Sequence, residues 1–192
     1  MAATGSTSFA SYFARLHGDV AGEIEQFVNA FTVNETYFYR EEHQLHCLTN
    51  DLLAERALRR PRSEAIRIWS VPCSTGEEPY SIAIWLMENW RQVDSYNIEI
   101  VGSDIDTRAL KAAADGVYGE RALMRLSRDV IHRYFRPVAD GEYQIDPGLR
   151  DSIQFTRANL IDAQDMARYR DFDIVFCRNV LIYFDGASRR IA

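Results

Sequence analysis

The sequence predicts an α/β fold, in which a mostly parallel sheet is covered by helices on both faces. Short apolar segments bounded by turn residues alternate along the chain with longer segments that have helical spacing, and this alternation favours a parallel sheet. Polar residues also follow the ends of several apolar segments, where sheets of this kind bind ligands. With 192 residues, the chain is long enough for one such domain and a small additional piece.

The elements can be placed in order along the chain. Apolar residues recur at helical spacing over residues 8–31, with a break expected at His17-Gly18, and residues 41–60 form a second such stretch that Pro61 stops. The elements that follow are expected at 66–71 (strand), 79–91 (helix), 98–103 (strand), 106–114 and 127–135 (helices), about 142–156 (a short hairpin) and 172–185 (a buried strand running into a loop).

The composition is that of an ordinary globular chain, with 47% hydrophobic and 26% charged residues. A net charge of −6 argues against nucleic acid as the main partner, because neutralising phosphates requires a basic surface. The three cysteines, at 47, 73 and 177, are odd in number and scattered, as is usual in the reducing cytoplasm. The start of the chain lacks a signal-peptide pattern, and no apolar run approaches the roughly 20 residues that span a bilayer, so we expect a cytoplasmic protein.

The segment WSVPCSTGEEPYS, at residues 69–81, leads from a predicted strand into a predicted helix. The sequence contains neither G-x-G-x-x-G nor G-x-x-x-x-G-K-[ST], the motifs of dinucleotide sites and P-loops. Glu77 and Glu78 suit the positive end of the helix dipole but would repel a pyrophosphate. The site therefore suits a ligand that carries positive charge and hydroxyl groups. The alternative, that both glutamates only stabilise the start of the helix, stays open.

Polar residues also follow two further strands. Asp104 comes after the strand at 98–103, where α/β nucleoside sites hold an acidic residue for ribose hydroxyls. Asp106 is expected to cap the next helix, with Thr107 near its start. After the last strand, Asn179 and Tyr183 interrupt an apolar sequence. Three polar strand ends in one sheet favour a shared pocket.

Five motifs occur in order along the chain: NETYFYRE, CSTGEEPYSIAI, GSDIDTRAL, ANL and FCRNVLIYFD. Together they resemble the CheR family, the S-adenosylmethionine-dependent glutamate O-methyltransferases of bacterial chemotaxis receptors, over residues 20–190. The resemblance implies a Rossmann-like methyltransferase sheet, with S-adenosylmethionine as cofactor and S-adenosylhomocysteine as product. It also implies the cytoplasmic domains of chemotaxis receptors as partners.

The resemblance assigns roles to individual residues. It implies that Glu77 contacts the methionine end of the cofactor, that Asp104 binds its ribose and that Asn179 lines the reactive centre. The other residues that it implies are Asn34 and Thr36 in the cofactor pocket, Asn159 and Leu160 beside the adenine, and Arg40 and Tyr183 as the catalytic residues closest to the methyl group, with Arg40 also counted among the cofactor-binding residues.

The implied reaction needs few catalytic groups. A glutamate has an ordinary pKa of about 4.3, so the acceptor is an anionic nucleophile at neutral pH and requires no general base. The protein mainly has to align the reacting atoms, which can lower a barrier by roughly 7–11 kcal/mol in favourable cases. We expect Arg40 to orient the acceptor carboxylate through charge-assisted hydrogen bonds, and Tyr183 to place its hydroxyl or its ring near the donor.

The resemblance also suggests a division of the chain. Residues 1–33 are interpreted as the remnant of a helical N-terminal domain and residues 34–62 as a linker and a helix. Residues 63–192 are interpreted as the methyltransferase domain, with a small β insertion at about 137–156. The family's N-terminal domain is longer and its sheet continues past the helix that begins in GASRRIA, so we expect the chain to be truncated at both ends.

Other features have weaker interpretations. His43, His46 and Cys47 lie on adjoining helix positions, but no fourth ligand is apparent, so no metal site is expected. The hairpin looks short for a receptor's C-terminal tether peptide, so we expect tether-independent action. Two arginine runs are either solvated faces or a docking surface for the acidic methylation region of a receptor; they comprise residues 56, 59, 60, 62 and 67, and residues 121, 125, 128, 133 and 136.

Two alternative functions stay open. The first is a non-catalytic adaptor that senses S-adenosylmethionine or S-adenosylhomocysteine, although the presence of both Arg40 and Tyr183 argues against it. The second is a small-molecule carboxyl methyltransferase, whose pocket would be roofed over, whereas a protein substrate requires an open rim.

Overall fold

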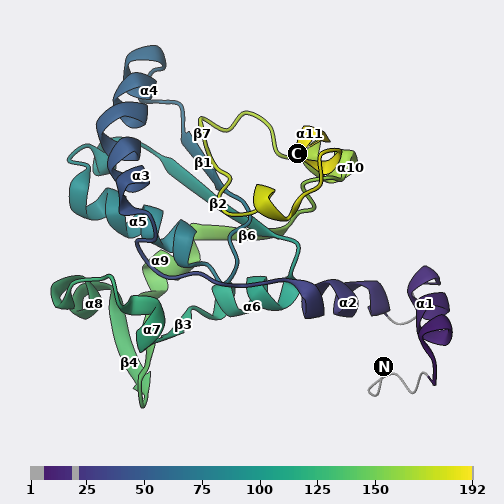
Figure 1. Cartoon of the computed structure of the whole chain (residues 1–192). Helices are drawn as coiled ribbons and strands as arrows, with labels where there is room; N and C mark the ends of the chain where they lie inside the picture. Colours follow the sequence, from purple (N-terminus) through teal and green to yellow (C-terminus); the bar gives the residue numbers. More distant parts are fainter. Residues whose placement is uncertain (1–6, 19–21, 192) are drawn as a thin grey trace. The chain divides into compact units, whose positions relative to one another are not determined.

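The computed structural model describes residues 7–18 and 22–191 (Figure 1). It divides into two units, Met1–Val33 and Asn34–Ala192, and each is described by itself. Within the described part of the chain, no helix is both long and apolar enough to cross a membrane.

The first unit contains two helices, α1 (Phe9–His17) and α2 (Glu23–Phe31). Ser8 begins α1 with a capping box, in which the Ser8 and Ser11 side chains each bond the other residue's backbone N–H. The helix ends at His17, and Gly18 follows as its C-cap. The break expected at His17-Gly18 is therefore confirmed.

The second unit opens with the helical stretch expected over residues 41–60. It consists of α3 (Glu42–Cys47), one π-helical segment, η3 (Leu48–Leu52), and α4 (Leu53–Arg59), and it ends before Pro61 as predicted. Its buried apolar side chains are Leu45, Leu48 and Leu53.

Four parallel strands form the central sheet, in the order β6-β2-β1-β7. They are β1 (Ile66–Ser70), β2 (Ile98–Asp104), β6 (Ile153–Arg157) and β7 (Ile174–Phe176). In this register Trp69 pairs with both Val101 and Val175. The carboxyl ends of all four strands thus lie at one edge of the sheet, and the predicted α/β fold is confirmed.

The short hairpin was predicted at the wrong place. The hairpin consists of β4 (Phe135–Ala139) and β5 (Glu142–Ile145), and β5 also pairs with β3 (Val117–Gly119) to make a separate antiparallel sheet. Residues 153–157, which the prediction paired with this hairpin, are β6 of the central sheet. The two are separated by α9 (Pro147–Ser152), which starts with Pro147 at a position that favours helix initiation.

The remaining helices connect the strands. The main ones are α5 (Glu77–Asn89), which begins two residues before the predicted 79, α6 (Thr107–Asp115) and α8 (Arg128–Tyr134). Asp106 caps α6 as predicted, since its Oδ1 accepts hydrogen bonds from the N–H groups of Arg108 and Ala109. The short elements are η4 (Val93–Ser95), α7 (Glu120–Leu123), α10 (Ala163–Met166), η5 (Leu181–Tyr183) and α11 (Ser188–Ile191).

Apolar side chains cover both faces of the sheet. On one face, Ile66 and Ile68 of β1 pack in a large cluster with α5, whose side chains from Tyr80 to Leu86 are nearly all buried. On the other face, Trp69 and Leu160 belong to a smaller cluster. Figure 1 shows α5 and α10 on opposite sides of the sheet. Burial of these faces fixes the strand ends that carry the predicted site.

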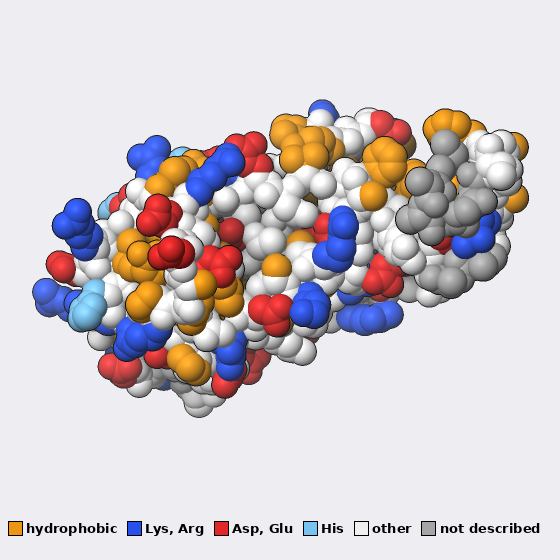
Figure 2. All heavy atoms as spheres, turned by 90° about the horizontal axis from the view of Figure 1, so that it is seen from below, with side chains coloured by type: hydrophobic (Ala, Val, Ile, Leu, Met, Phe, Trp, Pro, Cys, Tyr) orange, Lys and Arg blue, Asp and Glu red, His pale blue; other side chains and the backbone are white. Residues whose placement is uncertain are grey.

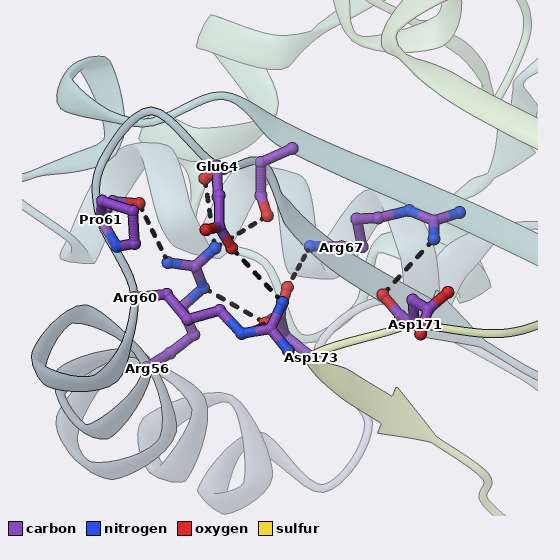
Figure 3. Close-up of polar contacts among 8 residues, drawn as sticks. Arg56, Arg60, Pro61, Glu64, Arg67, Asp171 and Asp173 are labelled. Carbon is purple, nitrogen blue, oxygen red and sulfur yellow. Dashed lines mark hydrogen bonds and ion pairs between the residues drawn. The ribbon is translucent and has the colours of Figure 1, made fainter.

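Strand β7 has only three residues and lies at the edge of the sheet. A buried ion pair stabilises the start of this strand. The carboxylate of Asp173 accepts hydrogen bonds from Nε of Arg56 at 3.2 Å and from the N–H of Arg67 at 2.9 Å. The Arg56 guanidinium also donates to the carbonyl groups of Glu64 and Ala65, at 3.2 and 2.9 Å (Figure 3). The Arg56–Asp173 pair therefore ties the end of α4 and the loop before β1 to the start of β7.

Candidate active site

A sharp turn connects β1 to α5 at the carboxyl edge of the sheet. The N–H of Cys73 donates to the carbonyl of Ser103 at 2.8 Å, which holds the turn against the end of β2. Gly76 has a φ of +92°, and a Cβ there would lie 2.8 Å from the Cβ of Ala113 and 3.0 Å from the hydroxyl of Tyr118. Only glycine fits this conformation and this space. The turn places Glu77 and Glu78 in the first turn of α5.

Glu77 is a buried carboxylate that has no cationic partner among residues 7–18 and 22–191. Its side chain is 4% exposed, and its Oε2 accepts a hydrogen bond from the hydroxyl of Thr75 at 2.7 Å. Burial raises its pKa, and within the described part of the chain the groups that oppose this rise are the Thr75 hydroxyl and a backbone N–H, with no cation among them. A ligand with an ammonium group would compensate this charge, so Glu77 fits the methionine end of the cofactor.

Glu78 has a different environment from Glu77. Its carboxylate accepts hydrogen bonds from Nη1 of Arg178 at 2.6 Å and from the hydroxyl of Ser70 at 2.8 Å. Burial raises its pKa, and the positive charge of Arg178 opposes that rise. Apart from the family resemblance, the sequence does not distinguish the two glutamates, whereas the structure pairs Glu78 with Arg178 and gives Glu77 no cationic partner among the described residues.

Asp104 lies at the end of β2 and organises the same edge. Its Oδ2 accepts from the N–H of Ser74 at 2.8 Å and its Oδ1 from the N–H of Asp106 at 2.9 Å, and burial raises its pKa. Each carboxylate oxygen keeps further acceptor capacity, which fits the ribose hydroxyls. Asn34 is joined to this group, since its amide donates to Asp106 at 2.9 Å and its Oδ1 accepts from the Ser74 hydroxyl at 2.9 Å.

The loop after β6 brings Asn159 and Leu160 to the same edge. The N–H of Ala158 donates to the carbonyl of Asp104 at 3.0 Å, so the start of the loop is bound to the end of β2. The N–H of Asn159 donates to the carboxylate of Asp165 at 3.1 Å, and Leu160 is buried in the smaller apolar cluster. An apolar side chain in a loop that is bound to the end of β2 fits one face of an adenine. Asp165 is a supporting residue that the sequence analysis did not identify.

Arg40 lies in the segment that precedes α3. Its Nη1 donates to the carbonyl of Glu35 at 2.5 Å, and its guanidinium lies 5.8 Å from the centre of the Tyr37 ring. Thr36, in the same segment, is half-buried. Both neighbours of Arg40 have a left-handed backbone, with φ values of 58° at Tyr39 and 55° at Glu41. Non-glycine residues seldom adopt this conformation unless other contacts hold them.

The segment after β7 reaches Arg40 through its neighbour Glu41. Asn179 has a φ of 55°, and its side chain is one of the groups that lower the pKa of Glu41. Arg178 ion-pairs with Glu41 at 3.3 Å and donates to the carbonyl of Arg40 at 2.8 Å. Burial works to raise the pKa of Glu41, but Arg178 and Asn179 lower it overall.

Tyr183 lies in η5 and its side chain is 65% exposed.

Taken together, these contacts bring Asn34, Glu77, Asp104, Asn159 and Leu160 to the strand ends, and they join Asn179 to the Arg40 segment. The closeness of Tyr183 to Arg40 stays a prediction.

The sequence analysis missed Arg178, the residue immediately before Asn179. A signal was available, because an arginine within an apolar strand end is expected to have an acidic partner. Its partners, Glu41 and Glu78, lie far away in the sequence and were not identifiable from it.

Comparisons with known proteins agree with this geometry. The family described as "CheR methyltransferase, SAM binding domain" matches residues 34–191. The chain is 45% identical over 186 residues to chemotaxis protein methyltransferase 2 of Vibrio cholerae, covering 96% of this chain and 64% of that protein. It is 43% identical over 186 residues to chemotaxis protein methyltransferase 2 of Pseudomonas aeruginosa, covering 95% and 64%. It is 36% identical over 190 residues to the chemotaxis protein methyltransferase of Escherichia coli, covering 97% and 63%. The chain thus spans slightly less than two thirds of the length of these relatives.

Proposed function

Because the chain belongs to the CheR methyltransferase family and carries its SAM-binding domain, we propose that it methylates glutamate side chains of chemotaxis receptors. The products are glutamate methyl esters that serve sensory adaptation. The observation that carries the proposal is the buried carboxylate of Glu77, which has no cationic partner among the described residues and lies at the same sheet edge as Asp104. One bound molecule that carries an ammonium group and ribose hydroxyls would satisfy both.

The proposed cofactor contacts are those that the family resemblance implies, and the burial of Glu77 and Asp104 at one sheet edge supports them. Glu77 takes the ammonium group of the methionine end, and Asp104 takes the ribose hydroxyls. The remaining proposed contacts are Asn34 and Thr36 in the segment before α3, Asn159 and Leu160 at the adenine, and Arg40 and Asn179 at the reactive end.

The catalytic work proposed for this chain is mainly alignment. When bound, S-adenosylmethionine supplies a methyl group activated by a positively charged sulfur. The acceptor glutamate is ionised at neutral pH, so no residue has to remove a proton. Arg40 holds the acceptor carboxylate through charge-assisted hydrogen bonds and so sets its direction of attack. Tyr183 lines the same end with its hydroxyl or ring.

The proposed partner is the cytoplasmic domain of a chemotaxis receptor, and we place the reaction in the cytoplasm. The first arginine run is a poor docking surface, because Arg56 is buried and ion pairs to acidic side chains engage Arg59, Arg60 and Arg67. In the second run Arg125 and Arg128 are exposed, and we propose that they contact the acidic methylation region. Figure 2 shows basic and acidic side chains interspersed on the face that it draws.

We propose that the receptor's tether peptide is not required, because the hairpin formed by β4 and β5 is short and spans residues 135–145.

Calorimetric titration of the 192-residue chain with S-adenosylhomocysteine is the first test. Binding in the micromolar range supports the site, and absence of binding contradicts it. Transfer of labelled methyl groups from S-adenosylmethionine to a receptor cytoplasmic domain, as base-labile esters, then tests the substrate. Binding without transfer would favour the sensing adaptor. Transfer only to small carboxylic acids would favour the small-molecule methyltransferase.

A further inference from the structure

We propose that Arg178 is a positioning residue, which sets the orientation of Arg40 by holding the backbone of residues 39–41. This inference rests on the proposed function, in which Arg40 orients the acceptor. Arg178 itself acts through the protein and not on the acceptor, because its two terminal nitrogens are occupied by protein oxygens.

The contacts of Arg178 join three segments of the chain. Nη1 donates to the Glu78 carboxylate in the first turn of α5, at 2.6 Å, while Nη2 donates to the carbonyl of Arg40 at 2.8 Å and lies 3.3 Å from the Glu41 carboxylate. The side chain is 9% exposed, and its buried Nε has no hydrogen-bond partner in the described part of the chain. The guanidinium is thus oriented so that it bonds Glu78 and the Arg40 segment, although this orientation leaves its Nε donor without an acceptor in the described part of the chain.

The backbone around Arg40 requires such a restraint. Tyr39 and Glu41 both have positive φ values, 58° and 55°, and this conformation has an energetic cost for non-glycine residues that the surroundings must offset. The N–H of Tyr39 donates to the hydroxyl of Ser81 at 3.0 Å. Arg178 supplies the matching contacts after Arg40. The two sets of contacts hold the segment from both sides, which fixes the direction in which the Arg40 side chain leaves the backbone.

The Glu78 carboxylate in turn fixes Arg178. Glu78 accepts from the hydroxyl of Ser70, the last residue of β1, at 2.8 Å. A continuous set of hydrogen bonds therefore runs from the end of β1 through Glu78 and Arg178 to the carbonyl of Arg40. Because the partners are charged and nearly buried, this geometry is more restrictive than that of a surface ion pair.

The decisive variant is Arg178→Met with Glu78→Met. Removing Arg178 alone would leave the Glu78 carboxylate buried without its cation and could unfold the chain, whereas replacing both partners by apolar side chains is often neutral for stability. We expect a thermal midpoint close to that of the wild type. We also expect faster hydrogen–deuterium exchange in the peptide covering residues 36–44, and a kcat about 10–100-fold lower, since small misplacements of an aligning group have effects of this size. The dissociation constant of S-adenosylhomocysteine should change by about twofold or less.

Two further variants make the result specific. Arg178→Lys keeps the charge but lacks the planar fork that serves two acceptors, so it should show an intermediate kcat. Asp173→Asn is the matched control, because it weakens the other buried pair of β7. It should lower the thermal midpoint while exchange at residues 36–44 and kcat stay unchanged.

Unchanged exchange and kcat in the double variant would overturn the proposal, and so would equal changes in Asp173→Asn. A large loss of S-adenosylhomocysteine affinity with kcat intact would also overturn it, because Arg178 would then act on the cofactor. If the wild-type chain transfers no methyl group but the exchange difference persists, the proposed function fails while the positioning role stands.

Discussion

Two buried arginine–carboxylate pairs hold the short strand β7, one at each end. Arg56 and Asp173 meet at 3.2 Å before the strand, and Arg178 and Glu78 meet at 2.6 Å after it. Both pairs are nearly inaccessible to solvent. The remaining acceptors of the two arginines differ. Arg56 donates to carbonyl groups of the loop before β1, where no site residue is predicted, whereas Arg178 donates to the backbone of Arg40. The same ion-pair chemistry thus secures the fold at one end and the geometry of the site at the other.

The largest expected effect comes from breaking the first pair. Arg56→Ala leaves Asp173 buried without its cation and three carbonyl groups without a donor. The free energy of unfolding should fall by about 3–5 kcal/mol. Urea unfolding followed by tryptophan fluorescence measures this loss. A change below about 1 kcal/mol, as for a surface ion pair, would show that the Arg56–Asp173 pair does not stabilise the fold.

The second prediction concerns Arg40. Of the two buried pairs, the Arg178 pair contacts its backbone and the Arg56 pair does not. Arg40→Ala should lower kcat for receptor methylation by about 100–1000-fold, because the acceptor carboxylate loses its charge-assisted donor. The dissociation constant of S-adenosylhomocysteine should stay nearly the same, and so should the thermal midpoint. Methyl transfer and calorimetry on one preparation measure all three. Equal turnover in the variant and the wild type would reject the role of Arg40.

The smallest expected effect concerns Glu77, which has no cationic partner among the described residues, whereas Glu78 is paired with Arg178. Burial raises the pKa of Glu77 above its ordinary value. A raised pKa in the folded state contributes stability that is fully present when the pH is below the ordinary pKa of the carboxyl group. This contribution is lost as the pH rises through the raised pKa of the folded state. Glu77→Gln should therefore raise the thermal midpoint at neutral pH, and the gain should vanish on acidification.

The same variant should bind S-adenosylhomocysteine roughly tenfold more weakly, since an amide cannot compensate an ammonium group. In the wild type, affinity should fall as pH drops through the raised pKa of Glu77, and in Glu77→Gln this dependence should flatten. Thermal scans and titrations across pH test both. A variant that binds as tightly as the wild type would leave Glu77 as a helix-terminal charge only.

Much of the fold and of the candidate site could be predicted, because the features concerned depend on residues that are close together in the sequence. The alternation of apolar segments located β1, β2 and β7, and Asp106 was identified as a cap from its position before α6. The strand-end positions of Glu77, Glu78, Asp104 and Asn179 predict a shared site because polar residues there lie at one edge of a parallel sheet, and only the family resemblance selects Glu77 over Glu78. The start of α5 is predicted two residues late, at 79 instead of 77.

The errors and omissions come from contacts between distant parts of the chain. Residues 153–157 have the turn-rich surroundings of a hairpin, and only their pairing with β2 makes them part of the central sheet. The difference between Glu77 and Glu78 depends on Arg178, which lies 100 positions away from its partner. Residue type and position alone do not distinguish the two glutamates; only the family resemblance does.

The pairing of β1 with β7 also affects the order in which contacts form while the chain is synthesised. Arg67 and Asp173, which bond across this boundary, are 106 positions apart. During synthesis the ribosome has released the turn at Gly76 and the Asp104 edge long before β7 emerges. Joining such distant segments requires closure of a long loop, which delays their contact. The turn at Gly76 and the end of β2 at Asp104 are therefore translated well before Arg178, and the bond from Arg178 to the carbonyl of Arg40 can form only after them.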